Sequence, residues 1–291
     1  MGDVSGIFSR MLVAIDGSEP SKESLRVAAR LAREHGGTLV LCHVVDWVPL
    51  VAEVDAAGGG MTGIAMDARP IIDSLETQGK AMLSHAAERV KAFGVPFQER
   101  QIDGEAAENI LRVAEELECS LIVMGTHGRE GVARFFVGST TESVLRASTI
   151  PVLTIRSGER LPQEGRRSFE RVLVGIDRSS PSQAATERIL LEPELHHVFF
   201  LSVAHGDLAK ERAQALVDSA VGAARARKIE ADGTVRDGDP IQTLIHAAKR
   251  GNADLIVVGS HGRQGIRRFF LGSVAEGVLR EAPVPVLVIR T

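Results

Sequence analysis

Short runs of aliphatic residues alternate along this chain with longer stretches in which apolar side chains recur every three or four positions. Continuous apolar runs are typical of strands buried on both faces of a parallel sheet, and the longer spacing is typical of amphipathic helices. In the first half we predict strands at 11–16, 38–45, 96–102, 121–124 and 151–156, with helices at 18–36, 74–93 and 105–118. In the second half we predict strands at 171–177, 198–204, 255–258 and 285–290, with helices at 179–191 and 209–228.

Two segments interrupt this alternation. From 46 to 73 the periodicity disappears around three consecutive glycines, and we interpret this segment as a mobile arm or flap. Residues 157–170 are polar and contain Gly and Pro, as linkers do. The chain therefore divides into a domain at 1–156, a linker at 157–170 and a domain at 171–291. Each domain is predicted to be a doubly wound parallel α/β sheet with right-handed crossovers.

A glycine-rich stretch at 124–156, MGTHGREGVARFFVGSTTESVLRASTIPVLTIR, returns almost unchanged at 258–290, an offset of 134 positions. Each copy holds Gly-x-x-Gly, nine residues, then Gly-Ser. We expect Gly125 and Gly128 to allow positive φ and a close approach to a ligand. Ser139-x-x-Glu142 and its copy at Ser273 match the capping box of a helix start, and a helix N-terminus beside a glycine loop attracts phosphate. The alternative is that the glycines only form a turn and the serines only cap, but the intact second copy favours binding.

Candidate ligand-binding residues follow the strands at the sheet edge where such folds bind ligands. In the first half these are Asp16, Val44, the Gly125 loop and Ser139, and in the second half Asp177, Val203, the Gly259 loop and Ser273. A carboxylate repels phosphate, so we place Asp16 and Asp177 over sugar hydroxyls. A ribose beside a phosphate indicates a nucleotide. The alternative for both aspartates is that they cap the helices that follow them.

Composition excludes several other classes of function. The 291 residues carry 34 Lys and Arg against 38 Asp and Glu, with ten Phe, one Trp and no Tyr. A net charge of −4 and few aromatic rings argue against a nucleic-acid surface. No run approaches the ~18 apolar residues of a membrane span, and no secretory signal is recognisable, so we expect a cytoplasmic protein. We expect Cys42 and Cys119 to be buried thiols and predict no metal centre built by the protein.

The segments IDGSEPS and IDRSSPS, the duplicated glycine motif and the terminal PVLxIR strands together resemble the universal stress protein family, in the version associated with its ATP-binding members. The resemblance covers both halves, so the chain resembles a tandem member. It implies two five-stranded parallel sheets of strand order 3-2-1-4-5. It also implies ATP, with magnesium held mainly by the phosphates, at Asp16, Val44, Gly125, Gly128, Gly138, Ser139 and Thr140, and at Asp177, Val203, Gly259, Gly262, Gly272, Ser273 and Val274.

The resemblance also bears on assembly, because the fifth strand is the sheet edge and the usual dimer surface of the family. We therefore expect the two halves to pair as an intramolecular pseudo-dimer through their last strands, and a homodimer remains open. Arg178 stands where the first half has Gly17, and it is expected either to cross the ribose pocket or to contact phosphate.

Three classes of function remain open. The first is an ATP-binding stress-response or signalling module that senses or sequesters nucleotide with slow or no hydrolysis. The second is an ATP-consuming hydrolase or transferase. The third is a partner-binding scaffold in which one or both pockets are vestigial. His127 and His261 lie inside the glycine loops, but the sequence identifies no carboxylate partner or nucleophile for them, so we predict no catalytic residue.

Overall fold

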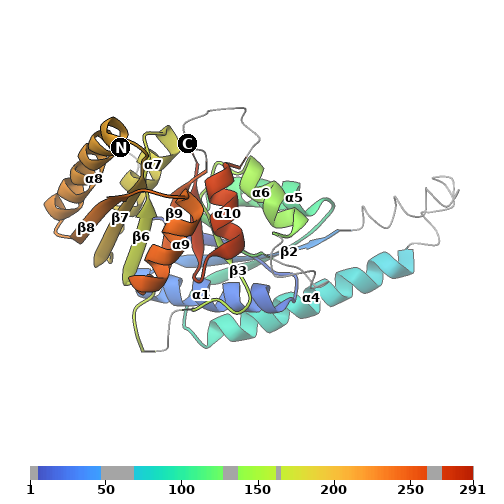
Figure 1. Ribbon diagram of the computed structural model, residues 1–291. Helices are drawn as coiled ribbons and strands as arrows, with labels where there is room; N and C mark the ends of the chain where they lie inside the picture. Colours follow the sequence, from blue (N-terminus) through green and yellow to red (C-terminus); the bar gives the residue numbers. More distant parts are fainter. Residues whose placement is uncertain (1–5, 47–68, 127–136, 162–164, 261–270, 291) are drawn as a thin grey trace, which may run out of the picture.

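The computed structural model describes residues 6–46, 69–126, 137–161, 165–260 and 271–290 (Figure 1). In the first half the elements are β1 Arg10–Ala14, α1 Glu19–His35, β2 Thr38–Val45, α4 Arg69–Lys91, β3 Phe97–Asp103, α5 Ala106–Glu116, β4 Leu121–Gly125, α6 Ser139–Ala147 and β5 Val152–Ile155. In the second half they are β6 Arg171–Gly175, α7 Ser180–Ile189, β7 His197–Val203, α8 Asp207–Ala226, β8 Glu230–Arg236, α9 Pro240–Arg250, β9 Leu255–Gly259, α10 Ser273–Glu281 and β10 Val286–Ile289.

All described strands belong to one ten-stranded sheet, in the order β3-β2-β1-β4-β5-β10-β9-β6-β7-β8. Within each half the pairs are parallel and follow the predicted 3-2-1-4-5 order, so the predicted α/β fold is confirmed. The halves meet where β5 pairs with β10 in antiparallel register, with Leu153 opposite Leu287. Pairing these two edge strands leaves neither one exposed, as expected for an aliphatic edge.

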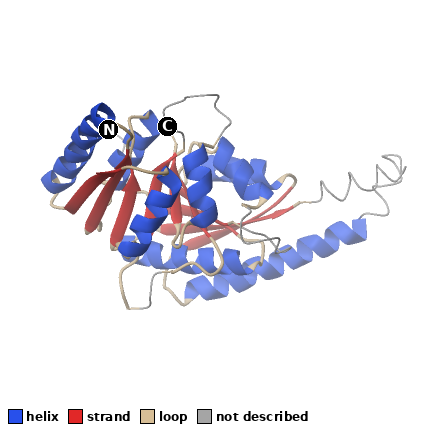
Figure 2. Ribbon diagram, viewed as in Figure 1, coloured by secondary structure: helices blue, strands red, loops and turns tan. Residues whose placement is uncertain are grey.

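Helices cover both faces of the sheet (Figure 2). One core contains the apolar side chains of α1, α4, α7 and α8. The other contains those of α5, α6, α9 and α10. Because successive strand residues point to opposite faces, the continuous apolar runs supply both cores. The free thiols of Cys42 and Cys119 are buried, as the sequence predicts.

Two arginines fasten the junction between the halves reciprocally. The Arg156 guanidinium, after β5, donates hydrogen bonds to the carbonyls of Arg280 and Ala282 at the end of α10. The Arg290 guanidinium, after β10, donates to the carbonyl of Arg146 at the end of α6. Terminal helix carbonyls lack partners within their own helix and carry partial negative charge. Each arginine therefore donates hydrogen bonds to the terminal carbonyls of the opposite half's helix and offsets their partial charge.

A second contact between the halves lies at the N-terminal segment. Glu192, in the loop after α7, is buried and accepts a hydrogen bond from the backbone N–H of Ile7. His35 Nδ1, at the end of α1, lies 3.9 Å from Glu192 Oε2. Burial raises the pKa of Glu192 to about 7. The halves therefore share a buried acid as well as a strand pair.

The start of α4 differs from prediction. The sequence predicts a helix from residue 74, whereas α4 begins at Arg69. Its first turns carry no buried side chain before Gly79, and Ile71 is 47% exposed, so they show no apolar stripe that a pattern could detect. Most of the predicted arm, residues 47–68, lies outside the described part of the chain.

Candidate functional site

A pocket of about 300 Å³ opens in the second half at the carboxyl ends of β6, β7 and β9. The N-terminus of α10 forms one wall, and Pro240 and Leu244 of α9 form another. The pocket brings together six of the residues expected from the sequence, Asp177, Val203, Gly259, Gly272, Ser273 and Val274. From the sequence we predict no element at the position of α9 and therefore do not predict this wall. The apolar stripe along α9 is the sequence signal that marks it.

The aspartate after the first strand of each half orients a serine. Asp177 Oδ1 accepts hydrogen bonds from the backbone N–H of Ser179 at 2.9 Å and from its hydroxyl at 2.5 Å. Ser179 in turn caps α7, because its side chain accepts from the N–H of Ser182 at 3.3 Å. In the first half Asp16 Oδ1 accepts from the N–H of Ser18, the residue that caps α1. The serines, and not the aspartates, are therefore the helix caps.

The helix starts after the glycine loops carry no side-chain cap. The N-cap residues are Gly138 for α6 and Gly272 for α10, and neither helix has a capping hydrogen bond from a side chain. The predicted capping boxes are therefore wrong. Ser139 and Ser273 are the first helical residues, and Glu142 pairs with Arg146 at 2.5 Å instead of reaching back to the helix start.

This lack of capping is shared by α8, whose N-cap is Gly206, but it is not general. Side chains cap four other helices, those of Ser18 on α1, Glu105 on α5, Ser179 on α7 and Asp239 on α9. No side chain therefore accepts from the first N–H groups of α6 and α10. These N–H donors, and the positive end of each helix dipole, can serve another acceptor. In α10 these donors border the pocket, where an anion is the partner that they favour.

The glycines that end β4 and β9 have a structural role. A Cβ atom at Gly259 would lie 2.6 Å from the backbone nitrogen of Ser182, and one at Gly125 would lie 2.6 Å from Cβ of Pro20. Neither glycine has positive φ, so the prediction of positive φ is wrong for Gly125, while Gly128 lies outside the described residues. Glycine is required here because the first turn of α1 or α7 packs against the end of the strand.

The first-half candidates occupy the corresponding places. Asp16 follows β1, Val44 lies in β2, Gly125 ends β4, Gly138 is the N-cap of α6, and Ser139 and Thr140 form its first turn. The Thr141 hydroxyl donates to the carbonyl of Gly125 at 2.7 Å and ties α6 to the end of β4. Gly128 and Gly262, with His127 and His261, lie outside the described residues.

Arg178 does not cross the second-half pocket. It is exposed and is not among the described residues that line the pocket. Gly17, its counterpart, has a φ of 79°, a conformation that Arg178 does not share.

The described residues contain no group of three or more His, Cys, Asp or Glu side chains placed to hold a metal ion. No helix among them has the length and apolar character needed to cross a membrane.

The comparisons with known proteins agree on one family. The model of the Universal stress protein family matches residues 8–156 and 168–290. A universal stress protein of Mycolicibacterium smegmatis is 26% identical over 96% of both chains. One from Bacillus subtilis is 34% identical over its whole length, which corresponds to 52% of this chain. A crystal structure of a universal stress protein from Archaeoglobus fulgidus matches 97% of both chains with a TM-score of 0.73 at 23% identity.

Proposed function

The chain belongs to the universal stress protein family, and we propose that it is an ATP-binding stress-response or signalling module that senses or sequesters nucleotide with slow or no hydrolysis. The pocket between β6, β7, β9 and α10 is the proposed site.

The observation that carries the proposal is the composition of this pocket's walls. Leu201 and Val203 of β7 offer an apolar surface suited to a flat base. Asp177 offers a carboxylate suited to ribose hydroxyls, which donate hydrogen bonds to it. The uncapped start of α10 offers N–H donors suited to phosphate. An apolar wall with a few convergent polar groups is the usual design of a small-molecule site, and about 300 Å³ is at the lower end of the usual range.

The first half supports a second site by the same reasoning. Asp16, Val44, Gly125 and the uncapped start of α6 at Gly138 have the same topological positions as their counterparts. We place the triphosphate at Gly138, Ser139 and Thr140 there, and at Gly272, Ser273 and Val274 in the second half. Magnesium would be held mainly by the phosphates.

Slow hydrolysis is proposed from the side chains that line the second-half pocket. Among the described lining residues, Asp177 is the single titratable one, and its Oδ1 already accepts two hydrogen bonds from Ser179. A general base must be able to take a proton from the attacking water. The role of these residues is therefore to bind and orient the nucleotide.

Calorimetric titration with Mg-ATP tests the proposal. We expect saturable binding that weakens in Asp177→Asn, because Asn keeps an oxygen for the Ser179 hydrogen bonds but removes the charge facing the ribose. The difference in affinity between ATP and 2′-deoxy-ATP should shrink in this variant. Binding that is unchanged in Asp177→Asn, or equal for the two nucleotides in the unchanged chain, would remove Asp177 from the ribose site.

A further inference from the structure

A second hollow, of about 480 Å³, lies on the other side of α9 from the nucleotide pocket. Pro240 and Leu244 of α9 line the nucleotide pocket, whereas Thr243, His246, Ala247 and Arg250 line this hollow. These two sets follow helical spacing on different sides of α9. We call the hollow the α9 groove, and its floor consists of Leu173, Phe199 and Leu201 from β6 and β7.

The first half fills the corresponding place with larger side chains. Ala247 and Gly251 of the groove correspond, at the offset of 134, to Val113 and Leu117. The correspondence holds in space, because Arg10 donates to the carbonyl of Leu117 at 2.8 Å and Arg171 donates to that of Gly251 at 3.4 Å. Val113 is 2% exposed and Leu117 packs against the core. The groove therefore exists because the second half lacks these two side chains.

The floor of the groove leaves an aromatic ring accessible. Phe199 pairs with Leu173 in the sheet, as Val40 pairs with Leu12 in the first half. Val40 is 1% exposed, whereas Phe199 is only half-buried although it is the larger residue. An accessible ring on the floor of a concave site favours a flat apolar ligand that stacks on it.

The rim of the groove is cationic. Arg236 and Arg250 stand where the first half has Ile102 and Glu116, and Arg171 lies at the end of the groove. All three arginines are exposed. Asp237, the one acid among the described lining residues, is already engaged by Lys210 at 2.9 Å and by His205 at 2.5 Å. The rim therefore favours a negatively charged group.

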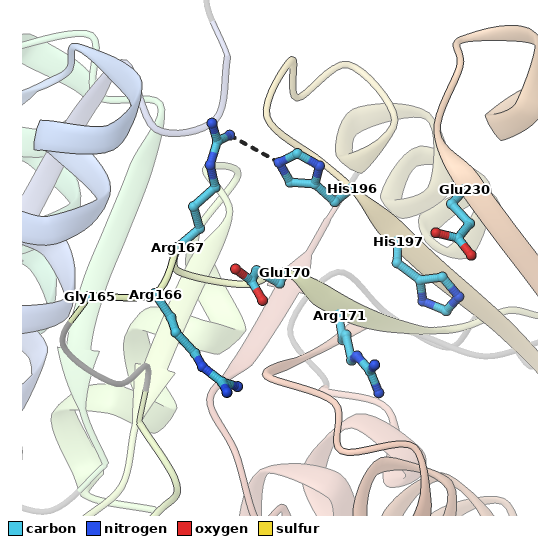
Figure 3. Close-up of a pocket in the computed structure, with 8 residues that line it drawn as sticks. All are labelled: Gly165, Arg166, Arg167, Glu170, Arg171, His196, His197 and Glu230. Carbon is cyan, nitrogen blue, oxygen red and sulfur yellow. Dashed lines mark hydrogen bonds between the residues drawn. The ribbon is translucent and has the colours of Figure 1, made fainter.

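The groove is open at its Arg171 end. Arg171 and His197 also line an adjoining depression of about 610 Å³. Figure 3 shows them on one side of this depression, with Arg166 and Arg167 of the linker on the other. Arg167 is held by Glu194 and lies 3.0 Å from His196 Nε2. The groove therefore adjoins a surface depression at Arg171 and His197.

We propose that the α9 groove binds a small organic anion with a flat apolar body, such as an aromatic carboxylate or sulfonate. The flat body lies on Phe199, between α9 and β7, and the arginine rim holds the anionic group. Helix α9 stands between this site and the nucleotide pocket, and Leu201 of β7 is the one described residue that lines both.

Fluorescence titration of the full chain with 8-anilinonaphthalene-1-sulfonate, a flat sulfonate, tests the proposal. The filled variant, Ala247→Val with Gly251→Leu, restores the residues of the first half. Gly251 has a φ of −80°, close to the −99° of Leu117, so the backbone suits the change. We expect the dissociation constant to rise at least about tenfold in the filled variant and in Arg250→Glu. Arg89→Glu, an exposed change on α4, is the control and should leave the constant unchanged.

Three outcomes would overturn the proposal. The groove is not the site if the filled variant, shown to be folded by circular dichroism, binds the dye as tightly as the unchanged chain. The local charge argument fails if Arg250→Glu and Arg89→Glu weaken binding equally. Complete displacement of the dye by excess Mg-ATP would place the dye in the nucleotide pocket. Binding that survives ATP and fails in the filled variant supports the proposal, whether or not the nucleotide pocket binds ATP.

Discussion

Placing an aspartate at position 272 should stabilise α10 and abolish nucleotide binding at its N-terminus. Gly272 has φ −65° and ψ 145°. These values are close to those of residues that already cap helices in this chain, Asp239 at φ −67°, ψ 126° and Ser179 at φ −79°, ψ 153°. The new carboxylate can therefore accept a hydrogen bond from the N–H of Ala275, as Asp239 does from the N–H of Gln242 at 2.9 Å. It would occupy the place proposed for phosphate.

The two effects have opposite signs and different sizes. A carboxylate at a previously glycine-capped helix start should add roughly 0.5–1 kcal/mol of stability, from the cap and the helix dipole together. A carboxylate about 4 Å from a phosphate charge costs about 4 kcal/mol at an effective dielectric constant of about 20. That energy corresponds to a nearly thousandfold loss of affinity. The variant should be a more stable protein that no longer binds ATP in its second half.

Gly272→Asn is the matched control, because it has the shape and capping ability of Asp without the charge. Urea unfolding should show both variants slightly stabilised. Calorimetry with Mg-ATP should show a far larger loss for Asp than for Asn, and the stoichiometry should fall by one site if both halves bind. If Gly272→Asp binds ATP within about threefold of the unchanged chain at that site, which is less than 1 kcal/mol, phosphate does not lie at the start of α10.

Three further predictions follow from contacts in the fold. Burial raises the pKa of Glu192 from 4.5 to about 7, so its ionisation should lower the unfolding free energy as pH rises from about 5 to 8. Urea titrations across this pH range should show that Glu192→Gln removes roughly 2–3 kcal/mol of this pH-dependent loss. An unchanged pH dependence in that variant would contradict the assignment. Arg156→Ala removes two donors from the end of α10 and should lower the unfolding free energy by roughly 1–3 kcal/mol, whereas the exposed Arg89→Ala should change it little. Gly259→Ala should lower the unfolding free energy by roughly 1–3 kcal/mol, because the new Cβ would lie 2.6 Å from the backbone nitrogen of Ser182. The variant should therefore have a lower Tm, and an unchanged Tm would show that α7 can shift at no cost.

The aliphatic runs predict the central strands well, since they record burial on both faces of the sheet, whereas the strand order was implied by the family resemblance. The polar strand β8 has no such run and was not predicted. Strand β2 has the predicted bounds Thr38–Val45, and α1 ends where Gly36 takes a φ of 65°. The start of α4 could not be predicted, because its exposed first turns have no periodic burial.

The structure gathers six of the residues expected in the second half around one pocket, but several contacts differ from those predicted. Sequence spacing cannot show that Glu142 prefers Arg146 to the helix start, nor that Gly125 is required by the packing of Pro20. The α9 groove was missed because it arises from side chains that are absent. Aligning the halves at the offset of 134, which sets Leu117 against Gly251, is the signal that would have revealed it.

A crystal structure of the full chain grown with Mg-ATP tests the central claim most directly. The account predicts phosphate oxygens within hydrogen-bond distance of the N–H groups of Val274 and Ala275, with the ribose hydroxyls on Asp177 and the base against Val203. Nucleotide density at the arginines of the α9 groove with the pocket beside α10 empty, or no bound nucleotide at saturating concentration, would contradict it.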